Sequence, residues 1–420
     1  MHRDNRRGVR VNMGRPQRVS VTALVCALCM VCALAVLARW PRWIRGPDEV
    51  YVVVAEDVWA GRLGVANYDD ETMADRTGAL SAGRNRNFLS PTPPSIAMLL
   101  LPLAWLPAES RPILWLLFNV AAFLAASVLL ARVVAWPMRR PWLAVTAAAA
   151  VLGSDPLAEN QSRGQVYLLL MPAVAFVLLA TAAGRPAGAA GLAICTAAKL
   201  WGGAVWLTLV AARAWRQLAT ATLLTATLLA ASLWATGIDM WRHYVGVVLP
   251  QWLTTPKMTV TAYQTIPAVF AHLLRADSQW NPDPLANLPV LAPILSIATG
   301  MSLLAVTLWR ATANEQRLAA VAASMVLAVL YSPVAEQYHY LLIVPSVAVA
   351  AERCLLQPSY RVALLTLALF LLLFPLPYKS PVLAAFAGGV FAYPRVVAAL
   401  IVWALLVIPA PLSCRRVTWA

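Results

Sequence analysis

The sequence is poor in charged residues. Only 12% of its 420 residues are charged, against roughly 25% in soluble domains, while 61% are hydrophobic and the mean hydropathy is +0.69. Long apolar runs recur from one end of the chain to the other, so the composition excludes a soluble globular protein. It predicts an all-α polytopic integral membrane protein, because each span must satisfy its own backbone hydrogen bonds.

Acidic residues are also scarce, with 18 Asp and Glu against 33 Lys and Arg, which gives a formal net charge of +15. Such an excess of positive charge is found in nucleic-acid-binding proteins. Here, however, the arginines cluster in short breaks between apolar runs, and no basic stripe interleaved with exposed aromatics lies on a soluble segment. The pattern excludes nucleic acid as a partner and indicates cytoplasmic loops of a membrane protein.

Histidine and cysteine are few, with four and six residues. Cys26, Cys29 and Cys32 lie within the first apolar run, and no cysteine and histidine have the spacing of metal ligands. We therefore predict neither cysteine chemistry nor a metal site built from these residues. The acid pairs Asp48–Glu49 and Asp69–Asp70 are of the type that binds a divalent ion, so the sequence leaves a metal requirement open.

The arginine-bearing breaks predict the topology. A basic tail, residues 1–18, precedes an apolar run without a small-residue cleavage site, which indicates a retained signal-anchor. Placing each arginine break in the cytoplasm requires two crossings between successive breaks, so both termini are cytoplasmic, including the tail 411–420. The transmembrane domain, 19–410, then has about twelve spans, at 19–39, 111–135, 142–156, 165–183, 187–199, 200–213, 217–236, 288–309, 318–331, 338–352, 361–375 and 394–410.

Three features of this topology bear on function. The segment 93–107 is apolar but short and bounded by proline, which favours a re-entrant or outer-leaflet helix over a span. The short segments 187–199 and 200–213 are expected to meet part-way through the membrane. The two long loops, 40–92 and 237–287, both fall on the outer side, so the active site is expected there.

Candidate site residues lie at the mouths of the apolar runs. Asp48 follows the first run and precedes Tyr51, which is where a carboxylate can act as general base on a lipid-borne substrate. In the polar stretch "DPLAENQSRGQVYLLL", Gly164 predicts a tight backbone at a helix entrance, and Gln165 can bond a sugar hydroxyl.

Positive charge near these mouths suggests phosphate binding. Lys199 lies between apolar residues, and two explanations stay open: its ammonium group reaches the outer headgroup layer, or it pairs with a phosphate. Arg84 and Arg86 can bind lipid phosphates. His339 lies at a span mouth, where it either bonds the end of a helix or donates to a phosphate oxygen.

Taken in order, these segments resemble glycosyltransferase family 87, membrane-embedded enzymes of the GT-C class. Its best-known members are α-mannosyltransferases that use polyprenyl-phosphate-mannose. The matching segments in this chain are Asp48 with Tyr51, Thr92-Pro93-Pro94, Pro156…Gly164-Gln165, Gly191…Lys199, Tyr263-Gln264-Thr265 and Ser332-Pro333…His339. The resemblance extends from about Gly46 to Pro345.

The chain departs from the family pattern at several positions. The spacing between Asp48 and Tyr51 is one residue shorter than in the family pattern. Thr92 replaces a tyrosine, Tyr167 replaces an asparagine, and Trp201-Gly202-Gly203 replaces the proline expected after Lys199. These departures affect the identity of the sugar and of the acceptor rather than the fold.

The resemblance implies a GT-C fold and an inverting transfer of a sugar from a polyprenyl-phosphate donor to a cell-envelope glycolipid or glycan. Mannose is the first choice of sugar and arabinofuranose an alternative. Asp48 would be the general base. The resemblance implies no definite cofactor and leaves a divalent metal open. Residues implied in binding the donor phosphate or sugar are Lys199, His339, Gln165, Gln264, Arg84, Arg86 and Tyr51. The protein would lie in a bacterial plasma membrane.

Two other functions stay open on the sequence: a transporter or flippase for lipid-linked sugars, and a catalytically inactive member that acts as a scaffold. A transporter predicts internal repeats and charges along a path through the bilayer. Neither inverted repeats nor such a path is evident, since Lys199 is the main charge within an apolar run. The transferase is therefore favoured.

Overall fold

The computed structural model describes residues 21–39, 44–80, 87, 89, 92–254, 259–278, 280–355, 359–380, 382 and 391–409. Within these ranges the chain is mostly helical and has no strand, as the sequence predicts. The helices of the first half are α1 Val21–Ala38, α3 Glu49–Trp59, η1 Val65–Tyr68, α4 Asp70–Leu80, α5 Ile96–Leu100, η2 Leu101–Trp105, α6 Arg111–Val133, α7 Trp136–Arg139, α8 Pro141–Leu152, α9 Asp155–Ser162, α10 Tyr167–Ala182, η3 Pro186–Gly188, α11 Ala189–Lys199 and α12 Gly203–Ala211.

The second half continues the same architecture. Its helices are α13 Trp215–Thr236, α14 Ile238–His243, the π-helical turn η4 Tyr244–Val248, α15 Leu249–Thr254, α16 Ile266–Leu274, α17 Leu291–Ala311, η6 Asn314–Gln316, α18 Arg317–Leu330, η7 Gln337–Ile343, α19 Val344–Leu355, α20 Ser359–Leu373 and α22 Pro394–Val407. Each of the twelve segments predicted as spans is occupied by helix.

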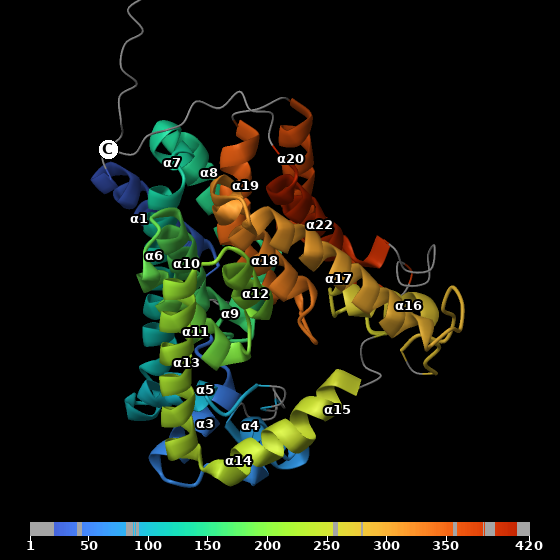
Figure 1. The fold of residues 1–420 in the computed structure, drawn as a ribbon. Helices are drawn as coiled ribbons and strands as arrows, with labels where there is room; N and C mark the ends of the chain where they lie inside the picture. The colour runs from blue at the N-terminus through green and yellow to red at the C-terminus, as the bar shows by residue number, and fades with distance from the viewer. Residues whose placement is uncertain are drawn as a thin grey trace, which may run out of the picture.

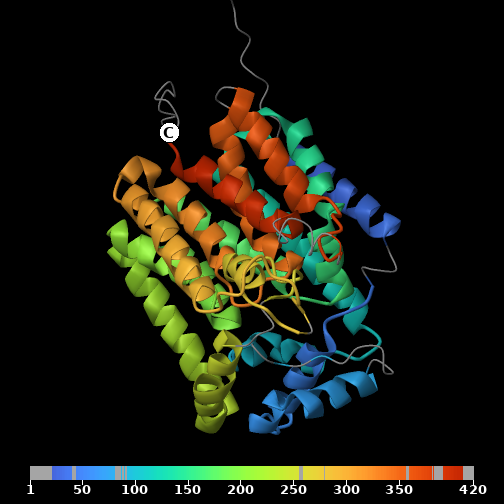
Figure 2. The same cartoon turned by 90° about the vertical axis from the view of Figure 1, so that its right-hand side faces the viewer.

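Three described helices, α6, α13 and α17, are long and apolar enough to cross a membrane. The shorter apolar helices include α8, α10, α20 and α22; among them, α10 packs along α6, and α22 packs between α18 and α20 (Figure 1). Turned by 90°, α13 and α17 lie on one side of the molecule, and α1 with α8 on the other (Figure 2). This architecture fits a membrane protein, while the number of crossings and their orientation stay predictions.

Small residues bring the central helices close together. A Cβ atom on Gly191 of α11 would lie 2.2 Å from the backbone oxygen of Ala173 in α10, so α11 packs on α10 at a distance that glycine alone permits. Glycine at helix crossings is common in membrane proteins, where close backbone packing replaces the hydrophobic effect as the source of helix association.

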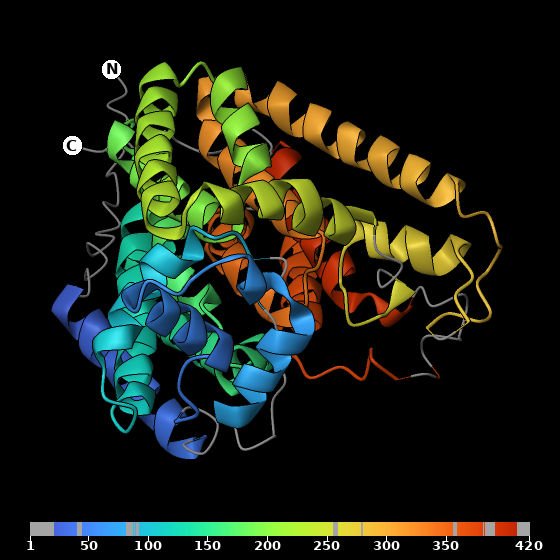
Figure 3. The same ribbon diagram turned by 90° about the horizontal axis from the view of Figure 1, so that it is seen from below.

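The two long loops of the prediction are folded. Residues 44–80 form α3, η1 and α4, and residues 238–254 form a continuous arm through α14, η4 and α15. Seen from below, both cross the same end of the helix bundle (Figure 3). The rings of Tyr68 and Tyr244, 5.7 Å apart, connect them. Together they cover one end of the helix bundle.

Both segments predicted as short have short helices, while their position in the membrane stays a prediction. Residues 93–107 contain only α5 and η2, which are too short together for a span and pack against α3. Helices α11 and α12 are separate, and the chain turns between them at Leu200, with φ of 50°, and Gly202, with φ of 109°. The break places Lys199 at the very end of α11.

Candidate active site

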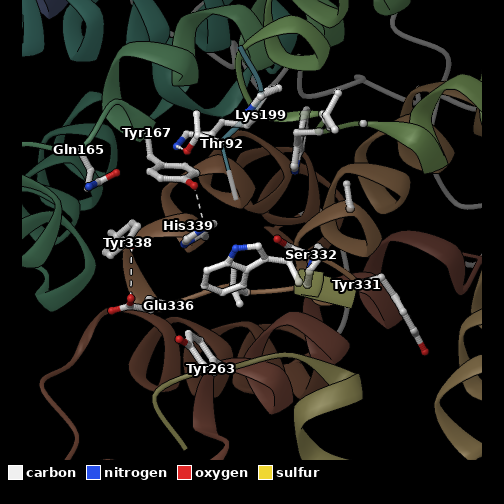
Figure 4. A pocket seen from close by; sticks show the side chains of 18 of the residues that line it. Thr92, Gln165, Tyr167, Lys199, Tyr263, Tyr331, Ser332, Glu336, Tyr338 and His339 are labelled. Atoms are coloured by element: carbon white, nitrogen blue, oxygen red, sulfur yellow. Dashed lines mark hydrogen bonds between the residues drawn. The ribbon is translucent and has the colours of Figure 1, made fainter. Parts of the chain in front are cut away.

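A cavity of about 1370 Å³ lies where the covering segments meet the bundle. Its walls come from the start of α3, the α9–α10 turn, the α11–α12 break, and the segment before η7. These elements bring together five residues singled out from the sequence: Asp48, Tyr51, Gln165, Lys199 and His339. Figure 4 shows Gln165, Lys199 and His339 around this space.

Asp48 is the N-cap of α3. Its Oδ1 accepts from the backbone N of Val50 at 3.0 Å, which satisfies one free amide of the first helical turn, and from Nδ2 of Asn87 at 2.9 Å. Its Oδ2 accepts from Nε2 of Gln165 at 2.8 Å. The side chain is 7% exposed, so these three donors fix the carboxylate at the cavity wall.

Gly164 brings the α9–α10 turn against the backbone of Asp48. Gly164 has φ of 61°, and its carbonyl accepts from the backbone N of Asp48 at 3.0 Å. A Cβ on Gly164 would lie 2.2 Å from that nitrogen and 2.6 Å from the carbonyl oxygen of Gly46. The tight backbone predicted at this position is thus present, and it exists because two chain segments touch there.

Gln165 connects Asp48 to Tyr51. While its Nε2 donates to Asp48, its Oε1 accepts from the Tyr51 hydroxyl at 2.7 Å. The amide therefore has no freedom to rotate, and it presents the carboxylate in a single orientation. Gln165 and Tyr51 position Asp48, a role the sequence reasoning did not assign to either.

The surroundings of Asp48 oppose its charge. The pKa of Asp48 is raised to about 6: burial and, to a lesser degree, the charge of Glu49 raise it, while the bonds from Val50 and Asn87 and the charge of Lys199 act in the lowering direction. A carboxyl group with this pKa is ionised at neutral pH yet basic enough to accept a proton, as a general base must be.

Lys199 reaches the same space from the end of α11. Its Nζ donates to Oγ1 of Thr92 at 3.1 Å and lies 5.5 Å from the ring centroids of Tyr51 and Tyr167. The neighbouring Ser95 hydroxyl donates to the carbonyl of Ala197, which holds the Thr92 segment against α11. The ammonium group thus points into the cavity over two aromatic faces.

His339 and Tyr167 form a pair beside Lys199. The Nε2 of His339 and the hydroxyl of Tyr167 share a hydrogen bond of 2.6 Å, and the two rings, with centroids 4.2 Å apart, are tilted by 44° to each other (Figure 4). The Nδ1 atom of His339 is buried, so the ring contributes to the site through its bond with Tyr167.

A chain of ion pairs borders the opposite wall of the cavity. Arg163 lies 3.1 Å from Glu159 and 3.1 Å from Glu336, and Lys379 lies 3.1 Å from Glu159. Burial raises the pKa of Glu336, which Arg163 opposes. The polar stretch of α9 and the turn after it therefore contributes to the cavity wall through Glu159, Arg163 and Gln165.

One end of the cavity is apolar. Leu207 of α12, Ile297 and Met301 of α17, and Leu327 of α18 line it, together with Trp252 of α15. The side chains of Leu207, Ile297 and Met301 are 48%, 65% and 62% exposed, so the cavity wall is continuous with the outer surface between α12 and α17.

One predicted site residue, Gln264, lies elsewhere. Gln264 is fully buried away from the cavity: its Nε2 donates to the backbone oxygens of Thr261 and Ala392, and its Oε1 accepts from the backbone N of Arg395. Both ends of the side-chain amide are hydrogen-bonded to backbone groups, so we do not include Gln264 in the site. Arg84 and Arg86 lie outside the described residues.

Several site residues were not predicted as such. Asn87, Thr92, Tyr167 and Glu336 all line the cavity. Thr92 and Tyr167 occupy positions at which the chain departs from the family pattern, and here they bond Lys199 and His339. The departure itself was the available signal. Within the described ranges, no group of three or more His, Cys, Asp or Glu side chains is arranged to hold a metal ion.

Comparison with known proteins identifies the family. The family model described as glycosyltransferase family 87 matches residues 92–333, which is more than half of the chain and includes Gln165 and Lys199. Asp48 and His339 lie outside the matched range. No curated protein matches the chain. On the strength of this match, the chain belongs to glycosyltransferase family 87 and is a glycosyltransferase.

Proposed function

We propose that the protein transfers a sugar, with mannose as the first choice, from a polyprenyl-phosphate donor to a cell-envelope glycolipid or glycan on the outer side of a bacterial plasma membrane. The observation that carries the proposal is a buried carboxylate and a lysine in one cavity, of which one end is apolar. The polar end suits a sugar phosphate, and the apolar end suits its lipid tail.

Asp48 acts as the general base in this proposal. Its carboxylate takes the proton from an acceptor hydroxyl, whose oxygen attacks the anomeric carbon on the face opposite the phosphate. The new C–O bond forms as the bond from the anomeric carbon to the phosphate oxygen breaks, and the electron pair leaves with polyprenyl phosphate. The configuration inverts. Three hydrogen bonds to the Asp48 carboxylate, donated by Gln165, Asn87 and Val50, support this role. They fix the direction in which the carboxylate accepts the proton.

Lys199 and His339 stabilise the departing phosphate. The Lys199 ammonium group lies across the cavity from the ion-paired wall, and it is held by Thr92 without a carboxylate in direct contact with it among the described ion pairs. His339, which lines the cavity and bonds the Tyr167 hydroxyl beside Lys199, is the second group in this proposal. A preorganised cation in a dry site stabilises developing negative charge far better than water does.

The apolar end supports a lipid donor. A polyprenyl chain would lie along Leu207, Ile297 and Met301 and leave the protein between α12 and α17, where these side chains are exposed. Apolar side chains facing outward at this opening match the hydrocarbon around them. The donor then reaches the site from within the membrane, while the acceptor enters from the covered end.

Substitution of Lys199 tests the proposal. Purified protein is reconstituted in liposomes with a radiolabelled polyprenyl-phosphate-mannose and an extract of envelope glycolipids, and the released polyprenyl phosphate is measured. We expect the wild type to release it and Lys199→Gln to do so about 10²–10³-fold more slowly, as when one oxyanion-stabilising group is lost. Arg242→Gln, on the exposed surface of α14, is the matched loss of a cation and is expected to leave the rate unchanged.

The outcome also separates the alternatives. Movement of intact labelled donor across the bilayer without release of polyprenyl phosphate would indicate a flippase. A wild-type protein that neither moves nor cleaves any lipid-linked sugar, in the series with mannose, glucose and arabinose, would contradict the enzymatic proposal.

The pH profile follows from the pKa of Asp48. A carboxyl group whose pKa is raised to about 6 is protonated, and inactive as a base, below that value. We expect kcat/KM to be level above pH 7 and to fall about tenfold per pH unit below about pH 6. The measurement is the initial transfer rate between pH 4.5 and 8.5 in liposomes. A level profile down to pH 4.5 would assign the proton transfer to a different group.

A further inference from the structure

A second, smaller cavity of about 220 Å³ adjoins the first. Arg163, Tyr263 and Glu336 line both cavities, so the two spaces meet at these three side chains. Trp280 and Lys379 line the second cavity further. Trp280 comes from the connection between α16 and α17, and Lys379 from the chain that follows α20, so five separate segments surround one small space.

The charges around this cavity cancel. Arg163 pairs with Glu336 and with Glu159, each at 3.1 Å, and Glu159 pairs with Lys379 at 3.1 Å. With Glu159, which lines the first cavity and pairs with Arg163 and Lys379, the two cations and two carboxylates give a net charge of zero. A phosphate site requires an excess of positive charge, so this cavity favours an uncharged ligand.

The paired groups keep hydrogen-bonding capacity for such a ligand. A carboxylate has about four lone-pair positions and a guanidinium group five N–H donors, and the ion pairs use only part of them. The side chains of Arg163 and Lys379 are 47% and 44% exposed and that of Glu336 is 18% exposed, so a ligand can reach them. Trp280, 49% exposed, and Tyr263 add aromatic faces.

Alternating donors and acceptors beside aromatic faces match one chemical class. A sugar ring presents hydroxyl groups at its edge and C–H groups on its face, and the C–H groups pack on an aromatic ring. A volume of about 220 Å³ lies below the roughly 300–1,000 Å³ of pockets that hold a whole ligand. The second cavity is therefore suited to one ring of a longer saccharide.

We propose that the second cavity is a subsite for the acceptor, and that it binds the neutral sugar next to the one that receives the transferred unit. The inference rests on the proposed function. The side chain of Gln165 binds Asp48, and Arg163 lies two residues before Gln165. An acceptor with its reacting hydroxyl at Asp48 therefore extends past Arg163 and Glu336 into this space. In Figure 4, Tyr263 and Glu336 lie across the cavity from Lys199 and Thr92, so the acceptor and the donor phosphate occupy opposite walls. The acceptor then carries at least two sugar residues.

Trp280→Ala tests the subsite. Protein in nanodiscs is supplied with labelled polyprenyl-phosphate-mannose and with octyl glycosides that carry one, two or three sugars of the manno, gluco or arabino series. We expect the wild type to have a lower KM for acceptors with two or three sugars than for those with one. In Trp280→Ala, the KM for the longer acceptors rises about tenfold, while that for single-sugar acceptors and the kcat at saturating acceptor stay unchanged.

A matched variant and a binding measurement complete the design. Trp234→Ala removes a tryptophan that is 87% exposed on α13 and lines neither cavity, so its KM values are expected to equal those of the wild type. Saturation-transfer NMR with free di- and trisaccharides of the same series reports binding without turnover, and the signal is expected to be lost in Trp280→Ala. Thermal unfolding checks that both variants are folded.

The possible failures are distinct. A Trp280→Ala protein with the same KM values as the wild type, or with equal losses for one-sugar and longer acceptors, would overturn the subsite and leave the transferase intact. A wild type that transfers sugar equally well to all acceptor lengths would do the same. Absence of polyprenyl phosphate release by the wild type with every donor and acceptor would overturn the proposed function itself.

Discussion

Replacing Asp48 with asparagine is expected to lower kcat for sugar transfer about a thousandfold, within the roughly 10²–10⁴-fold contribution of general acid–base catalysis. Asparagine has nearly the same shape and keeps an oxygen to accept from Val50 and Asn87. It lacks a basic oxygen, and its NH₂ group would face the Nε2 of Gln165. Transfer of labelled sugar to acceptor, measured at saturating donor, gives the rate.

The control for this variant is Asp239→Asn. Asp239 is a carboxylate of α14 with 82% of its side chain exposed, so its replacement removes the same charge without touching the cavity. Thermal unfolding of both variants checks that the chain is folded. If Asp48→Asn kept the wild-type rate, or lost activity only in proportion to a loss of folded protein, the role of Asp48 as general base would be wrong.

The residual activity of Asp48→Asn offers a second check. Without an ionisable group at this position, the fall in rate expected below about pH 6 should disappear, because that fall comes from protonation of Asp48. A purely structural role for the carboxylate would instead leave the shape of the pH profile unchanged and lower the whole curve.

Much of the fold could be predicted because it depends on local physics. Apolar runs bounded by arginine mark helices such as α6 and α17, whose positions agree with prediction to within a few residues. The break between α11 and α12 was predictable because Gly202 and Gly203 interrupt an apolar segment. The helices within the two long loops were missed, because polar sequence on a covering segment lacks the hydrophobic run by which spans are recognised.

The site was harder to predict because its contacts join distant segments. Asp48 and Gln165 are separated by 117 residues, and Lys199 and Thr92 by 107. Asp48, Gln165 and Lys199 were found only because each stands out locally or matches a family motif. Partners with ordinary local sequence, such as Asn87, gave no such signal. Gln264 shows the opposite case, since a polar residue in a motif segment proves to bond backbone groups in the interior.

The departures from the family pattern have a physical explanation in these contacts. Thr92 is short enough for its hydroxyl to meet Lys199 at 3.1 Å, and the Tyr167 ring contacts the His339 ring while its hydroxyl bonds Nε2. Both substitutions therefore affect groups on the proposed phosphate side of the cavity.

Replacing Gly164 with alanine is the second change with a large expected effect. The added Cβ would lie 2.2 Å from the backbone N of Asp48 and 2.5 Å from the carbonyl carbon of Pro47, and neither backbone atom can move aside as a side chain would. The α9–α10 turn must therefore shift away from the start of α3, which breaks the bond from Asp48 N to Gly164 O and displaces Gln165. A displacement of about 1 Å at a catalytic group costs about 10²-fold in rate.

Alanine at Gly164 also suffers from its backbone conformation, and this part can be separated experimentally. Gly184, in the turn after α10, has φ of 63°, nearly the same as the 61° of Gly164, but a Cβ there meets nothing within 4 Å. Gly184→Ala thus carries the same backbone strain of about 1–2 kcal/mol without the collision. We expect both variants to show lower thermal stability, and only Gly164→Ala to lose transfer activity about a hundredfold or more. Equal activities in the two variants would mean that close contact between Gly164 and Asp48 is not needed to position the carboxylate.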